Sequence, residues 1–137
     1  MTEQTLRTAG ILLVVLPTVA FGGVSILYLW LSSRSGYLNN RLRSRFWAAG
    51  HAHAGVLLVL SLIALLYVDG AALSGQLKTF VRWAVPGSAI LVPAGFFLSV
   101  LPRDEQKPSG IIKLAYLGFV TLSSGLLVLG IGLLRAL

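Results

Sequence analysis

Two histidines stand two residues apart in an apolar stretch, and their surroundings indicate a ligand site. His51 and His53 are the only histidines of the chain. An imidazole can ligate a haem iron or another metal ion, and it can carry a proton near neutral pH. The other residues of 48–55 are all Ala or Gly, including Gly50 and Gly55, so little side-chain bulk flanks the two rings. A planar cofactor could therefore reach either imidazole.

The spacing of the histidines restricts which ligand they can hold. Residues two apart on a helix point about 200° from one another, so His51 and His53 do not chelate one metal ion from a regular helix. A zinc site would need further ligands, and Asp69 lies at the far end of the same apolar run. A haem needs one axial nitrogen per face. The sequence therefore predicts haem b as the cofactor, with His51 or His53 on the iron and Gly50 and Gly55 clearing its space.

Two other interpretations remain open. Small residues also let a neighbouring helix approach closely in lipid, and the histidines would then form hydrogen bonds across that contact. The protein would in that case be a non-enzymatic scaffold or subunit. Alternatively, a small channel or carrier could use a histidine as its pH-sensitive group, because imidazole titrates near pH 6.5.

The elements that must position the histidines are four long apolar runs. Each is close to the ~20 residues that a helix needs to cross ~30 Å of hydrocarbon. Charged residues make up 11% of the chain and apolar residues 56%, whereas soluble proteins carry roughly 25% charged residues. The sequence predicts an all-α polytopic membrane protein, a single domain of four transmembrane helices. The runs cover residues 9–31, 46–68, 80–101 and 111–134.

The first run also has features of a signal peptide, because Arg7 precedes an apolar stretch and Ala20 could end a cleavage site. The apolar character continues to Leu31, well beyond that site. We therefore expect a retained transmembrane helix rather than a cleaved segment.

The basic residues predict how the protein sits in the membrane. The net charge is +7, and Lys and Arg between apolar runs are expected to contact anionic lipid headgroups rather than nucleic acid. The connections after the first and third runs carry more of these cations than the other side, so they are predicted to be cytoplasmic and both termini non-cytoplasmic in the cell membrane. The headgroup contacts are assigned to Arg34, Arg41, Arg43 and Arg45. The predicted cytoplasmic side also carries Arg103, Lys107 and Lys113. The basic residues of the other side are Arg7, Lys78, Arg82 and Arg135.

Several kinds of chemistry have no support. The chain has no cysteine, which excludes disulfides and thiolate ligands. No nucleophile–base pair, phosphate loop or paired carboxylate is present, so hydrolase and kinase chemistry lack candidates. The acids lie outside or at the margin of the runs, which disfavours a carboxylate-driven transporter. The acids in question are Glu3, Asp69, Asp104 and Glu105. The sequence leaves open whether the protein is an enzyme and favours a non-enzymatic role.

The run from His51 through Ala52, His53, Ala54 and Gly55 to Val-Leu-Leu is similar to the opening of a helix in small four-helix membrane proteins. It also resembles an early helix of haem–copper oxidase subunit I, in which such a histidine is an axial haem ligand. The resemblance covers about ten residues, and the copper-ligating histidines of that family are absent. It implies a haem-binding or redox accessory role without oxygen reduction. Small-residue faces on the second and fourth runs further predict a homo-oligomer or a place in a larger membrane complex.

Overall fold

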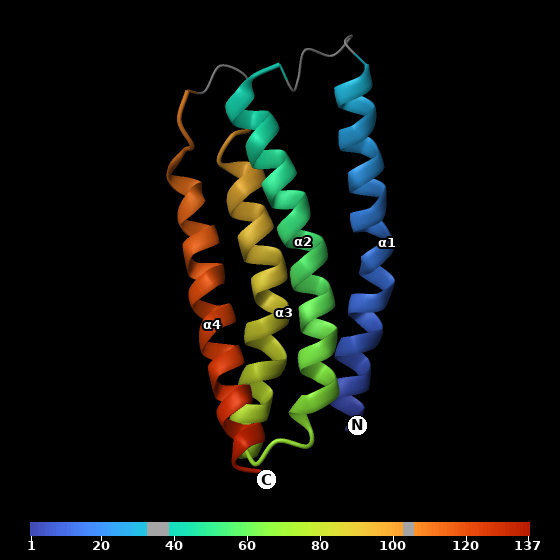
Figure 1. The fold of residues 1–137 in the computed structure, drawn as a ribbon, viewed down its shortest axis with the longest axis vertical. Coiled ribbons are helices and arrows are strands. Elements are labelled where there is room, and N and C mark those ends of the chain that lie inside the picture. The colour runs from blue at the N-terminus through green and yellow to red at the C-terminus, as the bar shows by residue number, and fades with distance from the viewer. Residues whose placement is uncertain (33–38, 103–105) are drawn as a thin grey trace.

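The computed structural model describes residues 1–32, 39–102 and 106–137, which form an up-and-down bundle of four α-helices without a strand. Figure 1 shows the helices running side by side, with both termini at the same end of the bundle. All four helices are long and apolar enough to cross a membrane, in agreement with the all-α expectation. They are α1 (Glu3–Leu31), α2 (Arg41–Val68), α3 (Gly75–Leu98) and α4 (Lys113–Leu134), with a short 3₁₀ turn, η1 (Gly110–Ile112), before α4.

Three helices begin earlier than the apolar runs because polar side chains cap them. The Asn40 side chain accepts hydrogen bonds from the backbone N–H groups of Leu42 and Arg43, so α2 starts at Arg41 with a basic first turn. Thr2 and Ser74 accept in the same way at the starts of α1 and α3. Each cap satisfies donors that would otherwise lack a partner in the first helical turn. Asparagine is one of the residue types that most often cap helices in this way.

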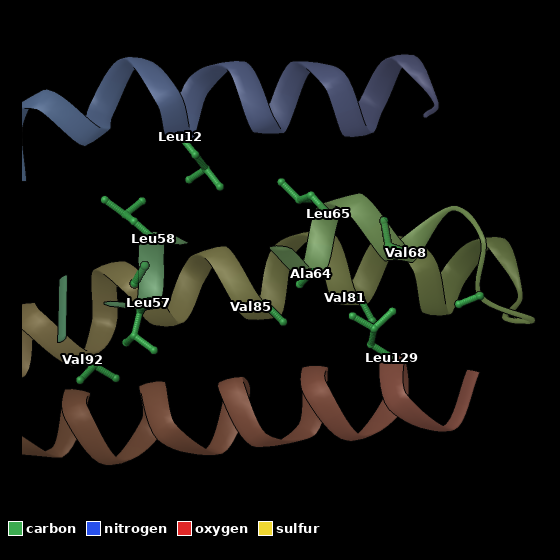
Figure 2. Close-up of a cluster of buried hydrophobic side chains, with 12 residues drawn as sticks. Leu12, Leu57, Leu58, Ala64, Leu65, Val68, Val81, Val85, Val92 and Leu129 are labelled. Carbon is green, nitrogen blue, oxygen red and sulfur yellow. The ribbon is translucent and has the colours of Figure 1, made fainter. Parts of the chain in front are cut away.

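The core lies along α3, which packs against both α2 and α4. In the most apolar stretch of α3, 56% of the residues are buried, against 6% for α1. Figure 2 shows the contributing side chains meeting between the helices. They are Leu12 from α1, Leu57, Leu58, Ala64, Leu65 and Val68 from α2, Ala71 from the α2–α3 connection, Val81, Val85, Ala89 and Val92 from α3, and Leu129 from α4.

Glycines on α3 and α4 let these two helices approach closely. A methyl group added at Gly118 would lie 2.6 Å from Val92 Cγ2, and one at Gly125 would lie 2.8 Å from Val85 Cγ2. Gly95 meets Ala115 at similarly short range. Gly118 and Gly125 of α4 thus serve a contact inside the bundle. These two glycines belong to a small-residue face that was predicted to form contacts between copies, and the homo-oligomer remains a prediction.

Helix α1 is the peripheral helix of the bundle. It lies beside α2 in Figure 1 and leaves most of its circumference uncovered. Val14, Phe21 and Tyr28 are among its exposed side chains. The attachment of α1 to the bundle therefore depends on a few contacts. They include its contact with His51 and its hydrogen bonds to the Arg82–Asp69 pair, both described below.

Candidate functional site

His51 on α2 lies against a notch in α1. The notch is the pair Gly22 and Gly23, and a methyl group built on Gly23 would come within 2.7 Å of His51 Nε2 and 3.0 Å of Cε1. His51 Nδ1 lies on the Gly22 side of the same notch. Only glycine at residue 23 leaves room for the ring in this position. The imidazole therefore forms part of the α1–α2 contact.

His53 points to the opposite neighbours. Its ring stacks on Phe96 of α3 with centroids 5.1 Å apart, and its edge contacts Phe119 of α4 at 5.6 Å. Nδ1–H donates to the carbonyl oxygen of Ala49, 2.7 Å away on the preceding turn. In a neutral imidazole this bond leaves the lone pair on Nε2. The two histidines thus face different helices, as their spacing predicted.

The two glycines assigned to a cofactor contact neighbouring helices. Gly50 is buried, and a methyl group added there would lie 3.1 Å from Phe96 and Phe97. The space expected beside Gly50 for a planar ligand is filled by these two aromatic side chains. Gly55 faces α1, where its added methyl would lie 3.9 Å from Val19 Cγ1.

An open apolar groove runs along α2 beside His51. Its volume is about 540 Å³, within the range of small-molecule sites. The lining is His51, Ala52, Gly55, Val56, Val59, Leu60 and Ile63. His51 is its only polar side chain, and no hydrogen bond joins this imidazole to another residue in the described part of the chain.

Among the described residues, no cluster of metal-ligating side chains surrounds the histidines. Within residues 1–32, 39–102 and 106–137, no group of three His, Cys, Asp or Glu side chains lies close enough to hold one. A chelated zinc ion therefore has no support among these residues. Single-nitrogen ligation, as in a haem, requires only one of the two imidazoles.

The arginines predicted to contact lipid headgroups separate into two kinds. Arg41 and Arg45 are exposed at the start of α2. Arg43 is 2% exposed, and its guanidinium donates to the carbonyl oxygens of Val100, Leu101 and Pro102 after the end of α3. A cation there offsets the partial negative charge of the helix C-terminus. The structure thus turns Arg43 inward, away from the headgroup role, while Arg34 lies outside the described residues.

A buried ion pair at the opposite end of the bundle was missed from the sequence. Arg82 of α3 donates to Asp69 at 2.5 Å, and the two side chains are 6% and 17% exposed. Thr5 of α1 joins the pair, because its hydroxyl accepts from Arg82 Nε and donates to Asp69. The sequence feature that could have revealed this pair is Arg82 itself. It is a charged residue between Val81 and Trp83 in an apolar run, and a charge in such a run needs a partner.

The environment of Asp69 shifts its ionisation. Burial alone raises the pKa of this carboxyl, but the hydrogen bonds from the Thr2 backbone N–H, Arg82 and Thr5, with the charge of Arg82, more than reverse that effect. The result is a pKa of about 2, below the ordinary value of 3.8. The pair therefore stays ionised at neutral pH and ties α1 to α2 and α3.

Comparisons with known proteins found no matching family model, no matching curated protein and no matching solved structure. The resemblance of the histidine segment to haem-binding helices therefore rests on its own residues.

Proposed function

We propose that this chain is a multi-pass integral membrane protein, without catalytic chemistry of its own, that acts through helix packing as a subunit or scaffold of a larger membrane assembly. The observation that carries the proposal is the position of the two imidazoles. His51 lies in the Gly22–Gly23 notch of α1, and His53 stacks on Phe96 of α3. Both histidines are thus used in contacts between helices.

The free surface for a partner is the outer side of α1. This helix has 29 residues, yet only 6% of its most apolar stretch is buried. Contacts between membrane helices depend on close packing rather than on exclusion of water. A long helix with little of its surface in use supports a role in which a further copy or another membrane protein packs against α1.

Cysteine cross-linking in native membranes tests this proposal, because the chain has no cysteine of its own. Val14→Cys places a thiol on the outer side of α1, where Val14 is 78% exposed. Ile90→Cys is the matched control on α3, where Ile90 is 71% exposed. Cross-linked adducts at residue 14 and none at residue 90 are expected. No adduct at either residue, or equal adducts at both, would contradict assembly through α1.

A haem b accessory protein is the second candidate, and His53 is the residue that favours it. The bond from Nδ1–H to Ala49 leaves Nε2 as the potential axial ligand, an arrangement common among metal-binding histidines. The ring is however covered by Phe96, and Gly50 gives no room because Phe96 and Phe97 fill it. As packed, the site does not fit a haem, which would need Phe96 to move.

Absorption spectroscopy separates the two candidates. The packing proposal expects no Soret band in purified protein supplemented with haem, and reduced stability in a His51→Gln/His53→Gln variant. A Soret band that disappears in His53→Gln and strengthens in Phe96→Ala would instead establish the haem protein. No observation in the described residues favours a transport pathway along α3, whose contact with α4 is closed by Gly118 and Gly125.

A further inference from the structure

The groove on α2 has one polar group, and it lies at one end. His51 is followed along the lining by the apolar residues 52 to 63. At 1.5 Å per residue, the distance from His51 to Ile63 is about 18 Å. No hydrogen bond joins the imidazole to another described residue. A ligand that matches this groove has one hydrogen-bonding head group and a long apolar tail.

The depth of His51 determines the charge of that head group. His51 lies ten residues after Arg41, about 15 Å further into the bundle along the helix axis. A charged phosphate or carboxylate would be costly at that depth without a partner charge, and no cationic side chain lines the groove. The head group beside His51 is therefore uncharged. A haem is disfavoured here, because the groove leads away from the arginines at the start of α2 and would place haem carboxylates in the apolar part.

The residues next to His51 determine the shape of the head group. Ala52 and Gly55 are the first lining residues and carry at most a methyl group, whereas Val56, Val59 and Ile63 follow with larger side chains. The lining thus offers room for a flat ring next to the imidazole and apolar contacts for a chain beyond it.

We propose that this groove binds a polyprenyl quinone from the bilayer. A ring carbonyl of the quinone accepts a hydrogen bond from His51, the ring lies over Ala52 and Gly55, and the prenyl tail follows the valines towards Ile63. The proposal concerns binding only and goes beyond the packing role proposed above. Because Nε2 of His51 lies against Gly23, the donor to the quinone is Nδ1, which lies 3.9 Å from a methyl group built on Gly22.

A second groove on α4 serves as an internal comparison. It has nearly the same volume, about 530 Å³, but its lining of Ser123, Leu126, Leu127, Gly130, Ile131 and Leu134 carries no imidazole. If any open apolar groove accepted the ligand, both grooves would bind it. The imidazole at its end distinguishes the groove on α2.

Fluorescence of Trp47, one turn before His51, reports binding. The protein carries Trp30→Phe and Trp83→Phe, so that Trp47 is the only tryptophan, and is placed in phosphatidylcholine vesicles with decylubiquinone, a quinone with a ten-carbon tail. We expect quenching that saturates with quinone concentration. His51→Leu raises the half-saturating concentration about five-fold, the loss of one hydrogen bond.

A matched pair of variants tests the groove without the histidine. Val56 in the α2 groove and Leu127 in the α4 groove are both 66% exposed. Val56→Phe fills the first groove and is expected to remove saturable quenching, whereas Leu127→Phe leaves it unchanged. Since Val56 lies outside the core, this pair keeps the test decisive even where His51→Leu fails to fold.

Three results would overturn the proposal. The first is quenching that rises linearly with quinone and is the same in all variants, which indicates partitioning into the bilayer. The second is equal displacement of the quinone by decanol, which indicates a site for any single-chain lipid. The third is a haem Soret shift that is lost in His51→Leu, which assigns the groove to haem.

Discussion

Arg82 and Asp69 lie on either side of the α2–α3 connection, and their side chains meet at 2.5 Å beneath the first turn of α1. Thr2, the N-cap of α1, and Thr5 in its first turn both form hydrogen bonds to Asp69. The pair thus joins three helices at the end of the bundle where both termini lie (Figure 1).

Removal of one partner of this pair is expected to destabilise the bundle strongly. Asp69→Asn leaves the buried Arg82 without its counter-charge and should lower the free energy of unfolding by roughly 3 kcal/mol. Unfolding in mixed micelles measures this change. The double variant Asp69→Asn/Arg82→Leu should recover part of the loss, because no uncompensated charge remains. Glu3→Gln, which changes an exposed acid on α1, is the control, and an equal effect of Glu3→Gln and Asp69→Asn would contradict the role of the pair.

The low pKa of Asp69 predicts a loss of stability in acid. Because the folded-state pKa is about 2 and the ordinary value is 3.8, the stabilisation is complete above the ordinary value and is lost as the pH falls through the folded-state pKa. The shift corresponds to about 2 kcal/mol. Unfolding in a non-ionic detergent between neutral pH and pH ~2 should show this fall relative to Asp69→Asn. Parallel pH profiles of the two proteins would exclude Asp69 as its source.

The contact between His51 and Gly23 is expected to appear as a coupling energy. Gly23→Ala places a methyl group 2.7 Å from His51 Nε2 and should cost about 1 kcal/mol, because the ring must move. In a His51→Ala background the same change should cost little. A double-mutant cycle measures the difference. Gly10→Ala is the control on the same helix, since its methyl would meet nothing within 4 Å. Additive free-energy costs of the changes at Gly23 and His51 would contradict a direct contact between the two residues.

The close approach of α3 and α4 predicts unequal effects of two glycine changes on α4. Gly118→Ala would push its methyl to 2.6 Å from Val92 Cγ2 and 2.9 Å from Val92 N, whereas Gly130→Ala would meet nothing within 4 Å. We expect a loss of about 2 kcal/mol for the first and a change below about 0.5 kcal/mol for the second. Thermal unfolding in detergent compares them. Similar values for the two would mean that Gly118 does not set the α3–α4 distance.

Much of the fold could be predicted from the sequence because it depends on local properties. Hydropathy over ~20 residues identifies a helix that can span a bilayer, and the cap at Asn40 follows from its side chain next to a helical run. The helices nevertheless begin earlier than the apolar runs, since capped polar turns extend α1, α2 and α3 beyond them. Apolar character marks the membrane-spanning part of a helix rather than its ends.

The candidate site was only partly predictable. That His51 and His53 face different neighbours follows from helical geometry alone. Which neighbours they meet does not, because that depends on how α1, α3 and α4 are placed around α2. The small residues around the histidines were predicted to make room for a cofactor, whereas Gly50 receives Phe96 and Phe97 of α3 instead.

The sequence by itself thus determined the number, type and apolar character of the helices and the opposite directions of the two imidazoles. Only the tertiary structure decided that Arg43 turns inward to the end of α3, that Arg82 pairs with Asp69 next to α1, and that Gly118 and Gly125 of α4 face α3. The physical reason is the separation along the chain over which each interaction acts. Helix formation and hydropathy depend on neighbours within a few turns, whereas these contacts join residues of different helices whose distances are set by packing of the whole bundle.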